Sequence, residues 1–222
     1  MIALLVITDG RKDCIAQTVP SALDNLKGDI DEWWMYDDSG DAAHRQWLAD
    51  RFPQFEVIWH PDGRQGFGGA IRAAWAHLAQ HSLADHVFHL EDDFTFNRPV
   101  PCGEMTEILN RHNTLGQVAL RRQPWNDIER SAGGVIEANQ GAYSEQRGSI
   151  ASWLEHDLFW TTNPSIYRRS LIDTVEWPTG AHTEGRFTIA MRELGYRFAY
   201  LGERSDPPWV HHIGNERIGT GY

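Results

Sequence analysis

The chain has 222 residues, of which 41% are hydrophobic and 23% are charged. That is the composition of an ordinary globular protein, and it excludes the disordered and fibrous classes. The formal net charge is −11, from 31 acidic residues against 20 Lys and Arg, and the sequence has no Lys/Arg run of the kind that binds nucleic acid nonspecifically.

Two further features bear on where the protein works. Cys14 and Cys102 are too few for a disulfide framework, so a reduced cytosolic chain is the simpler interpretation. The apolar run at residues 2–7 is only as long as a strand, and it lacks both the positive region of a signal peptide and the length of a membrane span. We therefore expect a cytoplasmic protein without a membrane segment.

In the first half of the chain, short apolar runs alternate with amphipathic stretches. The apolar runs predict strands at residues 2–8, 32–36, 55–59 and 86–90. The helical periodicity predicts helices at residues 13–26, 41–51 and 66–80, and Pro20 should kink or split the first of them. Such alternation predicts right-handed crossovers and an α/β fold, with a mainly parallel sheet and helices on both of its faces.

The second half is less regular. Its patterns predict helices at residues 102–112 and 184–194, strands at 117–120 and 197–202, and a hairpin or flexible loop at 133–144. The sequence contains no internal repeat, low-complexity tract or Pro/Ser-rich linker. We therefore expect residues 1–222 to form a single domain, with a regular half at 1–100 and a more elaborate half at 101–222.

Polar and acidic residues follow three of the predicted strands. They are Thr8-Asp9-Gly10, Asp37-Asp38 and Glu91-Asp92-Asp93. Ligands of an open α/β sheet bind beyond the carboxyl ends of the strands, so these clusters should meet at one rim. A divalent ion that bridges a diphosphate needs only one or two carboxylates, which a run of three acids can supply. The alternative is a solvated acidic turn.

Four motifs, in this order and spacing, resemble the GT-A glycosyltransferases, particularly the large family-two group. They are Ile7-Thr8-Asp9-Gly10-Arg11, Tyr36-Asp37-Asp38-Ser39-Gly40, Gly66-Phe67-Gly68-Gly69-Ala70-Ile71-Arg72 and Leu90-Glu91-Asp92-Asp93. The resemblance implies a GT-A (Rossmann-like) fold whose residues 1–100 bind a nucleotide sugar and whose smaller half, 101–222, binds the acceptor. It implies a transferase that uses a nucleoside diphosphate sugar, with a UDP-sugar favoured, that needs Mn²⁺ or Mg²⁺, and that inverts the anomeric configuration.

The resemblance also assigns residues to the donor. It places the first motif near the base or ribose, Asp37 or Asp38 against the uracil or ribose, and Arg72 near the nucleotide. The glycines before the third helix either cradle phosphate with backbone N–H groups or form a plain tight turn, and no Walker loop is present. The residues expected to bind the donor are Thr8, Asp9, Arg11, Asp37, Asp38, Gly66, Gly69, Arg72 and Asp92.

For the metal, Asp93 fits the last, ligating acid of the family's Asp-x-Asp motif, and Glu91 takes the place of the first. The resemblance implies a further ligand from a C-terminal histidine, in the stretch that holds His211 and His212. Adjacent side chains on a strand point to opposite faces, so at most one of the two should reach the site. The alternative is a hydrogen-bonded histidine without a role as a ligand.

Transfer also needs a group that accepts the proton of the attacking hydroxyl. Glu184 matches the position of the family's catalytic base, and Asp157 is a reserve candidate. The alternative for Glu184 is an acid that only stabilises the start of its helix through the macrodipole. Residues 159–165 combine aromatic and small polar side chains that suit an acceptor, with Trp160 and Asn163 as candidates, unless they form a core strand and a turn.

Other functions remain open on the sequence alone. One is transfer of a sugar to a hydroxymethylated DNA base, in which nucleic acid would be bound only as the acceptor. Another is a carbohydrate-binding module without catalysis. A sugar-nucleotide nucleotidyltransferase should have a longer Gly-rich loop with Arg and Lys than Thr8-Asp9-Gly10-Arg11 provides. The sequence predicts neither the acceptor nor the oligomeric state.

Overall fold

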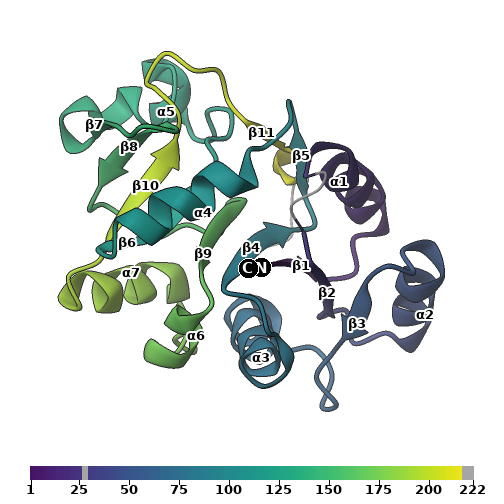
Figure 1. The fold of residues 1–222 in the computed structure, drawn as a ribbon. Helices are drawn as coiled ribbons and strands as arrows, with labels where there is room; N and C mark the ends of the chain where they lie inside the picture. The colour runs from purple at the N-terminus through teal and green to yellow at the C-terminus, as the bar shows by residue number, and fades with distance from the viewer. Residues whose placement is uncertain (27–29, 217–222) are drawn as a thin grey trace.

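The first apolar run forms the centre of one half of a large sheet, in a computed structural model that describes residues 1–26 and 30–216 (Figure 1). β1 (Ile2–Thr8) pairs in parallel with β2 (Glu32–Asp37) on one side and with β4 (His86–Glu91) on the other. β3 (Glu56–Ile58) pairs with β2 and forms the edge. The four strands predicted for the first half are therefore confirmed, in parallel orientation.

The second half extends the same sheet beyond β4. β9 (Ser165–Arg168) lies antiparallel between β4 and β6 (Leu115–Ala119). β10 (Arg197–Leu201) is parallel to β6, and a hairpin of β8 (Ser152–His156) and β7 (Ser144–Arg147) completes the order β3-β2-β1-β4-β9-β6-β10-β8-β7. All of these strands except β8 and β9 point the same way, so the sheet is mainly parallel, as predicted.

Helices cover both faces because side chains alternate along each strand. In β1, Leu4 and Val6 pack with α1 (Lys12–Asn25), α2 (Ala42–Arg51) and α4 (Cys102–Arg111). Ala3 and Leu5 point the other way, to α3 (Gly66–His81), α6 (Ser170–Thr174) and α7 (Thr183–Glu193). The predicted helices of the first half are thus present, each with its apolar side against the sheet.

Two local predictions are wrong or incomplete. Pro20 does not split α1, which is a single helix through this position, because Ile15 and Ala22 on either side of it are both buried against the sheet and this packing outweighs the lost backbone hydrogen bond. The stretch 133–144 contains the 3₁₀ helix η1 (Glu137–Ala142) after α5 (Asp127–Ala132), in place of a hairpin or a flexible loop. The reason is burial: Ile136 is fully buried in a small core that includes Tyr143 and Tyr200.

A second, two-stranded sheet lies at the carboxyl end of β4. It pairs β5 (Phe94–Phe96) antiparallel with β11 (Val210–His212), which continues into η2 (Ile213–Glu216). This pairing brings the C-terminal part of the chain to the residues that directly follow β4. Across residues 1–26 and 30–216, no helix has the length and apolar content that crossing a membrane would require.

Candidate active site

A cavity of about 500 Å³ opens where β4 ends, between the two halves of the sheet. Residues from distant parts of the chain line it, and six of those predicted from the sequence are among them. They are Arg11, Glu91, Asp93, Asn163, Glu184 and His212. The carboxyl rim predicted for the ligand is therefore hollow, and acids from both halves face it.

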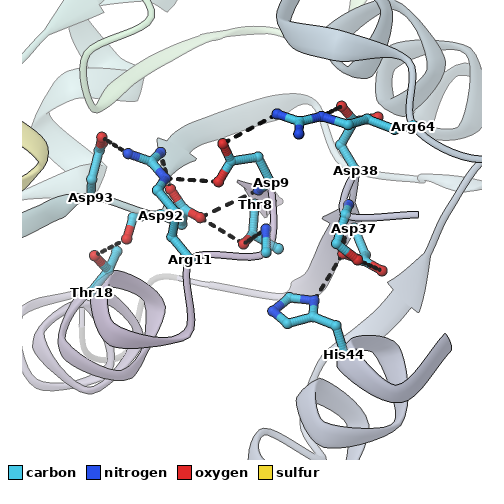
Figure 2. A network of polar contacts seen from close by, with 12 residues as sticks. Thr8, Asp9, Arg11, Thr18, Asp37, Asp38, His44, Arg64, Asp92 and Asp93 are labelled. Atoms are coloured by element: carbon cyan, nitrogen blue, oxygen red, sulfur yellow. Dashed lines mark hydrogen bonds and ion pairs between the residues drawn. The ribbon is translucent and has the colours of Figure 1, made fainter. Parts of the chain in front are cut away.

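Arg11 is the centre of a charge network at the end of β1 (Figure 2). Its Nε donates to Asp9 Oδ1 over 2.8 Å and its Nη1 donates to Asp93 Oδ2 over 2.6 Å, while Nη2 bonds to Asp92. The Asp92 side chain is fully buried and also accepts from the Thr8 hydroxyl over 2.6 Å. One guanidinium thus holds three carboxylates together, which no local pattern in the sequence indicated.

Asp93 combines a charged environment with an unused oxygen. Burial opposes the ionisation of Asp93, but the hydrogen bonds and charges of His212 and Arg11 outweigh it and lower its pKa. Its Oδ2 lies 3.0 Å from His212 Nε2, whereas Oδ1 is buried and has no hydrogen-bond partner among the described residues. An ionised carboxylate with a free oxygen beside an imidazole nitrogen is a donor set that Mn²⁺ and Mg²⁺ accept.

The strand pairing decides which of the two C-terminal histidines faces the cavity. β11 places His212 opposite Phe94 and His211 opposite Thr95, so the two side chains leave on opposite faces. His211 is exposed, and the His212 ring is stacked between Phe94 and Trp125. In the described part of the chain no group of three or more His, Cys, Asp or Glu is placed to hold a metal ion. Asp93 and His212 would therefore need phosphate and water oxygens to complete a cation's shell.

Glu184 enters the cavity from the first turn of α7. Its Oε1 accepts from the Thr162 backbone N–H over 2.8 Å and from the Thr162 hydroxyl over 3.4 Å. Burial raises the pKa of Glu184 above that of an ordinary glutamate. The neighbouring Glu91 has its pKa raised well above the usual range, by burial and by the charges of Asp93 and Glu184. The site therefore contains an acid that is easily ionised, Asp93, and two that are less so.

Comparison with known proteins gives matches in structure but not in sequence: no family model and no curated protein matches the chain. Residues 1–349 of TarS from S. aureus superpose with a TM-score of 0.65 over 96% of this chain and 60% of that one, at 14% identity. The mannosyltransferase PcManGT from Pyrobaculum calidifontis, solved with GDP-Man and Mn²⁺, gives 0.61 over 92% and 57%, at 14% identity. GalNAc-T7, solved with UDP, GalNAc and Mn²⁺, gives 0.67 over 96% and 43%, at 10% identity.

The chain has the GT-A fold. It spans between 43% and 60% of the length of these solved structures.

Within the GT-A fold, the two acids at the end of β2, Asp37 and Asp38, have different surroundings. Asp38 accepts from the backbone N–H groups of Gln65 and Gly66, over 2.7 and 2.8 Å, and so caps the start of α3. Asp37 points toward α2 instead, where His44 Nδ1 lies 2.9 Å from its Oδ1 (Figure 2). Asp38 lines a narrow recess next to the main cavity, together with Thr8 and Asp9, and Asp37 does not. Of the two acids, Asp38 is therefore the one that borders a space next to the cavity.

The glycine-rich turn at residues 66–69 allows two helices to pack closely. A Cβ atom at Gly68 would lie 2.7 Å from Thr183 Cγ2, so only glycine lets the first turn of α3 approach the first turn of α7. Gly66 has a positive φ of 71°, and a Cβ at Gly69 would meet Gln65 at 2.8 Å. This close approach places Glu184, next to Thr183, at the cavity.

Several predicted residues lie away from the main cavity. Arg72 forms an ion pair with Glu176 and lines a separate cavity of about 730 Å³, together with Gly66 and Gly69. Trp160 is 2% exposed and packs against Trp75 and Phe187, so the alternative of a core residue is the correct one for this side chain. Asp157 is exposed and, like His211, does not line the cavity.

Two charged cavity residues, Arg122 and Glu129, were not found from the sequence, whereas Thr162 belongs to the stretch 159–165 that the sequence analysis considered for the acceptor. Arg122 donates to Glu129 from both Nη atoms, over 2.7 and 3.2 Å. Asn126 caps α5 by accepting from the Glu129 backbone N–H over 2.9 Å. The Asn-x-x-Glu spacing is a helix-start signal and could have revealed α5, although not its place beside the cavity.

Proposed function

We propose that this chain is a metal-dependent glycosyltransferase that moves a sugar from a nucleotide-sugar donor, with a UDP-sugar as the first candidate, to a hydroxyl group. The observation that carries the proposal is that Asp93 and Glu184 line one cavity at the carboxyl rim of a GT-A fold. The names of the structural neighbours support it, because they include complexes with UDP-GlcNAc, with GDP-Man and Mn²⁺, and with UDP, GalNAc and Mn²⁺. A fold alone does not define a function, so the residues of the site are what distinguish this activity from others on the same fold.

Asp93 and His212 are the residues that would hold the cation, since Asp93 Oδ1 is buried without a hydrogen-bond partner among the described residues and the His212 ring lies beside the same carboxylate. A bound Mn²⁺ or Mg²⁺ would neutralise the charge that develops on the leaving diphosphate. The lowered pKa of Asp93 keeps this carboxylate ionised. Arg11 would leave Asp93 for the diphosphate, because its planar guanidinium suits phosphate oxygens as well as carboxylates.

Glu184 is the proposed base. The acceptor oxygen would attack the anomeric carbon, the bond from that carbon to the diphosphate oxygen would break, and Glu184 would take the hydroxyl proton. Thr162 fixes the Glu184 carboxylate through Oε1, and the raised pKa of Glu184 brings its basicity closer to neutral pH, which favours proton transfer. Displacement in one step would invert the anomeric configuration.

Asp38 and Thr8 support a nucleoside site next to the diphosphate. They line the narrow recess that shares Arg11, Phe67 and Glu91 with the main cavity. Arg64, on the rim of this recess, has its Nη2 3.6 Å from Asp9 and its Nε 3.9 Å from Asp38. A donor that spans both spaces would have its base near Asp38 and its sugar near Glu184.

Direct binding and turnover test the proposal. The melting temperature should rise with UDP and Mn²⁺ together and much less with either alone, because a ligand of the folded state stabilises it by mass action. Asp93→Ala should lose the Mn²⁺ dependence of this shift. Glu184→Gln should keep the shift and lose the release of UDP from a UDP-sugar. A chain that responds to no nucleotide would contradict the proposal and favour a carbohydrate-binding module, whereas a response to GDP alone would change only the donor.

A further inference from the structure

The segment from Arg121 to Trp125, which follows β6, is bound to the C-terminal segment along its length. Arg121, 6% exposed, donates to the carbonyl oxygens of Glu203, Arg204 and Asp206, over 2.6, 3.1 and 2.6 Å. The Arg121 carbonyl accepts from the backbone N–H of Trp209 over 2.8 Å. A buried arginine that bonds to three carbonyls of one turn fixes the path of the chain into β11.

Gln123 makes the next connection, to His212 itself. Its side-chain Nε2 donates to the His212 carbonyl over 2.9 Å, and its Oε1 accepts from the His212 N–H over 2.8 Å. The side-chain amide thus pairs with both backbone groups of one residue that is 89 positions away in sequence. Two hydrogen bonds to one residue define the direction in which its side chain leaves the backbone.

Trp125 acts on the imidazole ring. Its ring centroid lies 4.0 Å from that of His212 with an interplanar angle of 27°, and Phe94 stacks on the other side at 4.4 Å and 13°. Trp125 is itself anchored, because its backbone N–H donates to Glu129 over 2.7 Å and Glu129 is held by Arg122. The ring of His212 is therefore confined to one plane, with Nε2 3.0 Å from Asp93.

We propose that Gln123 and Trp125 are positioning residues, which orient His212 so that its Nε2 faces the metal site. The inference rests on the proposed function, since it concerns the same cation. Gln123 fixes the position of the His212 backbone and Trp125 fixes the plane of its ring. Nε2 is therefore held beside Asp93 before any cation binds. Removing such a partner of a metal ligand typically weakens metal binding about 10–100-fold.

The test measures Mn²⁺ binding to the full chain in the presence of UDP, from the electron paramagnetic resonance signal of free Mn²⁺. Gln123→Ala should weaken Mn²⁺ binding at least about tenfold, and Gln123→Glu, which keeps the size but loses the donor, should also weaken it. Trp125→Ala should weaken it as well, and Trp125→Phe should restore most of the affinity because a ring remains for stacking. Gln46→Ala is the matched control, since Gln46 is an exposed glutamine whose amide bonds only to Asp50 in the described structure. The Gln46→Ala variant should bind Mn²⁺ as the wild type does.

A double-mutant cycle separates positioning from general damage. If Gln123 acts through His212, then Gln123→Ala should add no further loss of Mn²⁺ affinity in the His212→Ala background. Full additivity, or wild-type affinity in both Gln123 variants while His212→Ala binds weakly, would overturn the inference and leave the proposed function intact. Unchanged Mn²⁺ affinity in both Asp93→Ala and His212→Ala would overturn the proposed metal site, and the inference with it.

Discussion

Arg11 donates a hydrogen bond of 2.6 Å to Asp93, across 82 positions of sequence, and the same guanidinium bonds to Asp92. The Asp92 side chain is fully buried, and that of Arg11 is only 10% exposed. The guanidinium of Arg11 therefore holds the adjacent carboxylates of Asp92 and Asp93 together just after β4. This arrangement makes Arg11 important for stability as well as for the proposed chemistry.

Arg11→Met should lower the free energy of unfolding by about 1–3 kcal/mol, because the buried Asp92 loses its charged hydrogen-bond partner. Burial already raises the pKa of Asp92 to about 7, so without Arg11 this carboxyl takes up a proton and does not remain as an unpaired buried charge. Urea denaturation measures this loss. Asp92→Asn in the Arg11→Met background should recover part of it, since the remaining group is neutral and can still accept from Thr8. Arg130→Met removes one member of an exposed pair and should change stability by no more than about 0.5 kcal/mol. An Arg11→Met protein as stable as the Arg130→Met protein would contradict the prediction.

Gly68→Ala should destabilise the protein by about 1–3 kcal/mol and reduce turnover, because the added methyl group would meet Thr183 and push α7 away from α3. Thermal unfolding and UDP release measure the two effects. Thr183→Ser removes the Cγ2 atom that causes the clash, so the double variant should recover much of the loss. Gly103→Ala, on α4 with open space around it, is the control and should be neutral or stabilising. Equal behaviour of the two alanine variants would show that the approach of α3 to α7 is not tight.

The turnover rate should depend on pH through Glu184. The base must be ionised to accept a proton, so the rate should fall as pH falls through its pKa, and burial raises that pKa. The acidic limb of kcat against pH should therefore lie above the range of an ordinary glutamate. Glu184→Gln should lower kcat by about 10²–10⁴-fold and abolish this limb. A Glu184→Gln enzyme that retains both the rate and the limb would exclude Glu184 as the base.

Stability should fall in mild acid because of His156, which is buried among aromatic rings that include Tyr143 and Tyr200. Burial lowers the pKa of His156 to about 4, whereas an unfolded histidine titrates near 6.5. Its neutral form thus contributes stability above about pH 6.5, and that contribution is lost as pH falls toward 4, at up to about 1.4 kcal/mol per pH unit.

His156→Phe should therefore flatten the decline of the unfolding free energy between pH 6.5 and 4. Denaturation at a series of pH values measures the slope. His89→Phe offers an independent check, since burial also lowers the pKa of His89 to about 4. If both variants kept the wild-type slope, other groups would be responsible for the acid sensitivity.

The regular half of the fold could be predicted because its signals are local. Apolar runs such as Ile2–Thr8 and amphipathic stretches such as Gly66–His81 each carry their own periodicity, so the predicted strands and helices appear in the structure with ends that differ by one or two residues. The strands β5, β9 and β11, of three or four residues, were not predicted, because they are too short to show a clear period. They form only because a distant partner offers hydrogen bonds.

The candidate site also contains residues that could be predicted from local patterns and contacts that could not. The residues that end strands, such as Thr8 and Asp93, could be assigned to one rim because parallel strands end together. Two sets of contacts could not be predicted, because each joins segments about 80–90 residues apart. They are the bonds of Arg11 to Asp92 and Asp93 and the stacking of the His212 ring on Trp125. The aromatic stretch that includes Trp160 gave no sign of whether it faces the core or a ligand.

The sequence by itself determined the order of strands and helices in the first half and the acidic rim at their ends, because hydrophobic period and chain direction are local properties. Only the tertiary structure decided that Asp38 rather than Asp37 lines the recess, that His212 rather than His211 faces Asp93, and that Glu184 reaches the same cavity. Those choices depend on which face of a strand is covered and which segments pack together. They are settled by contacts between residues far apart in the chain, such as Gly68 with Thr183 and Gln123 with His212.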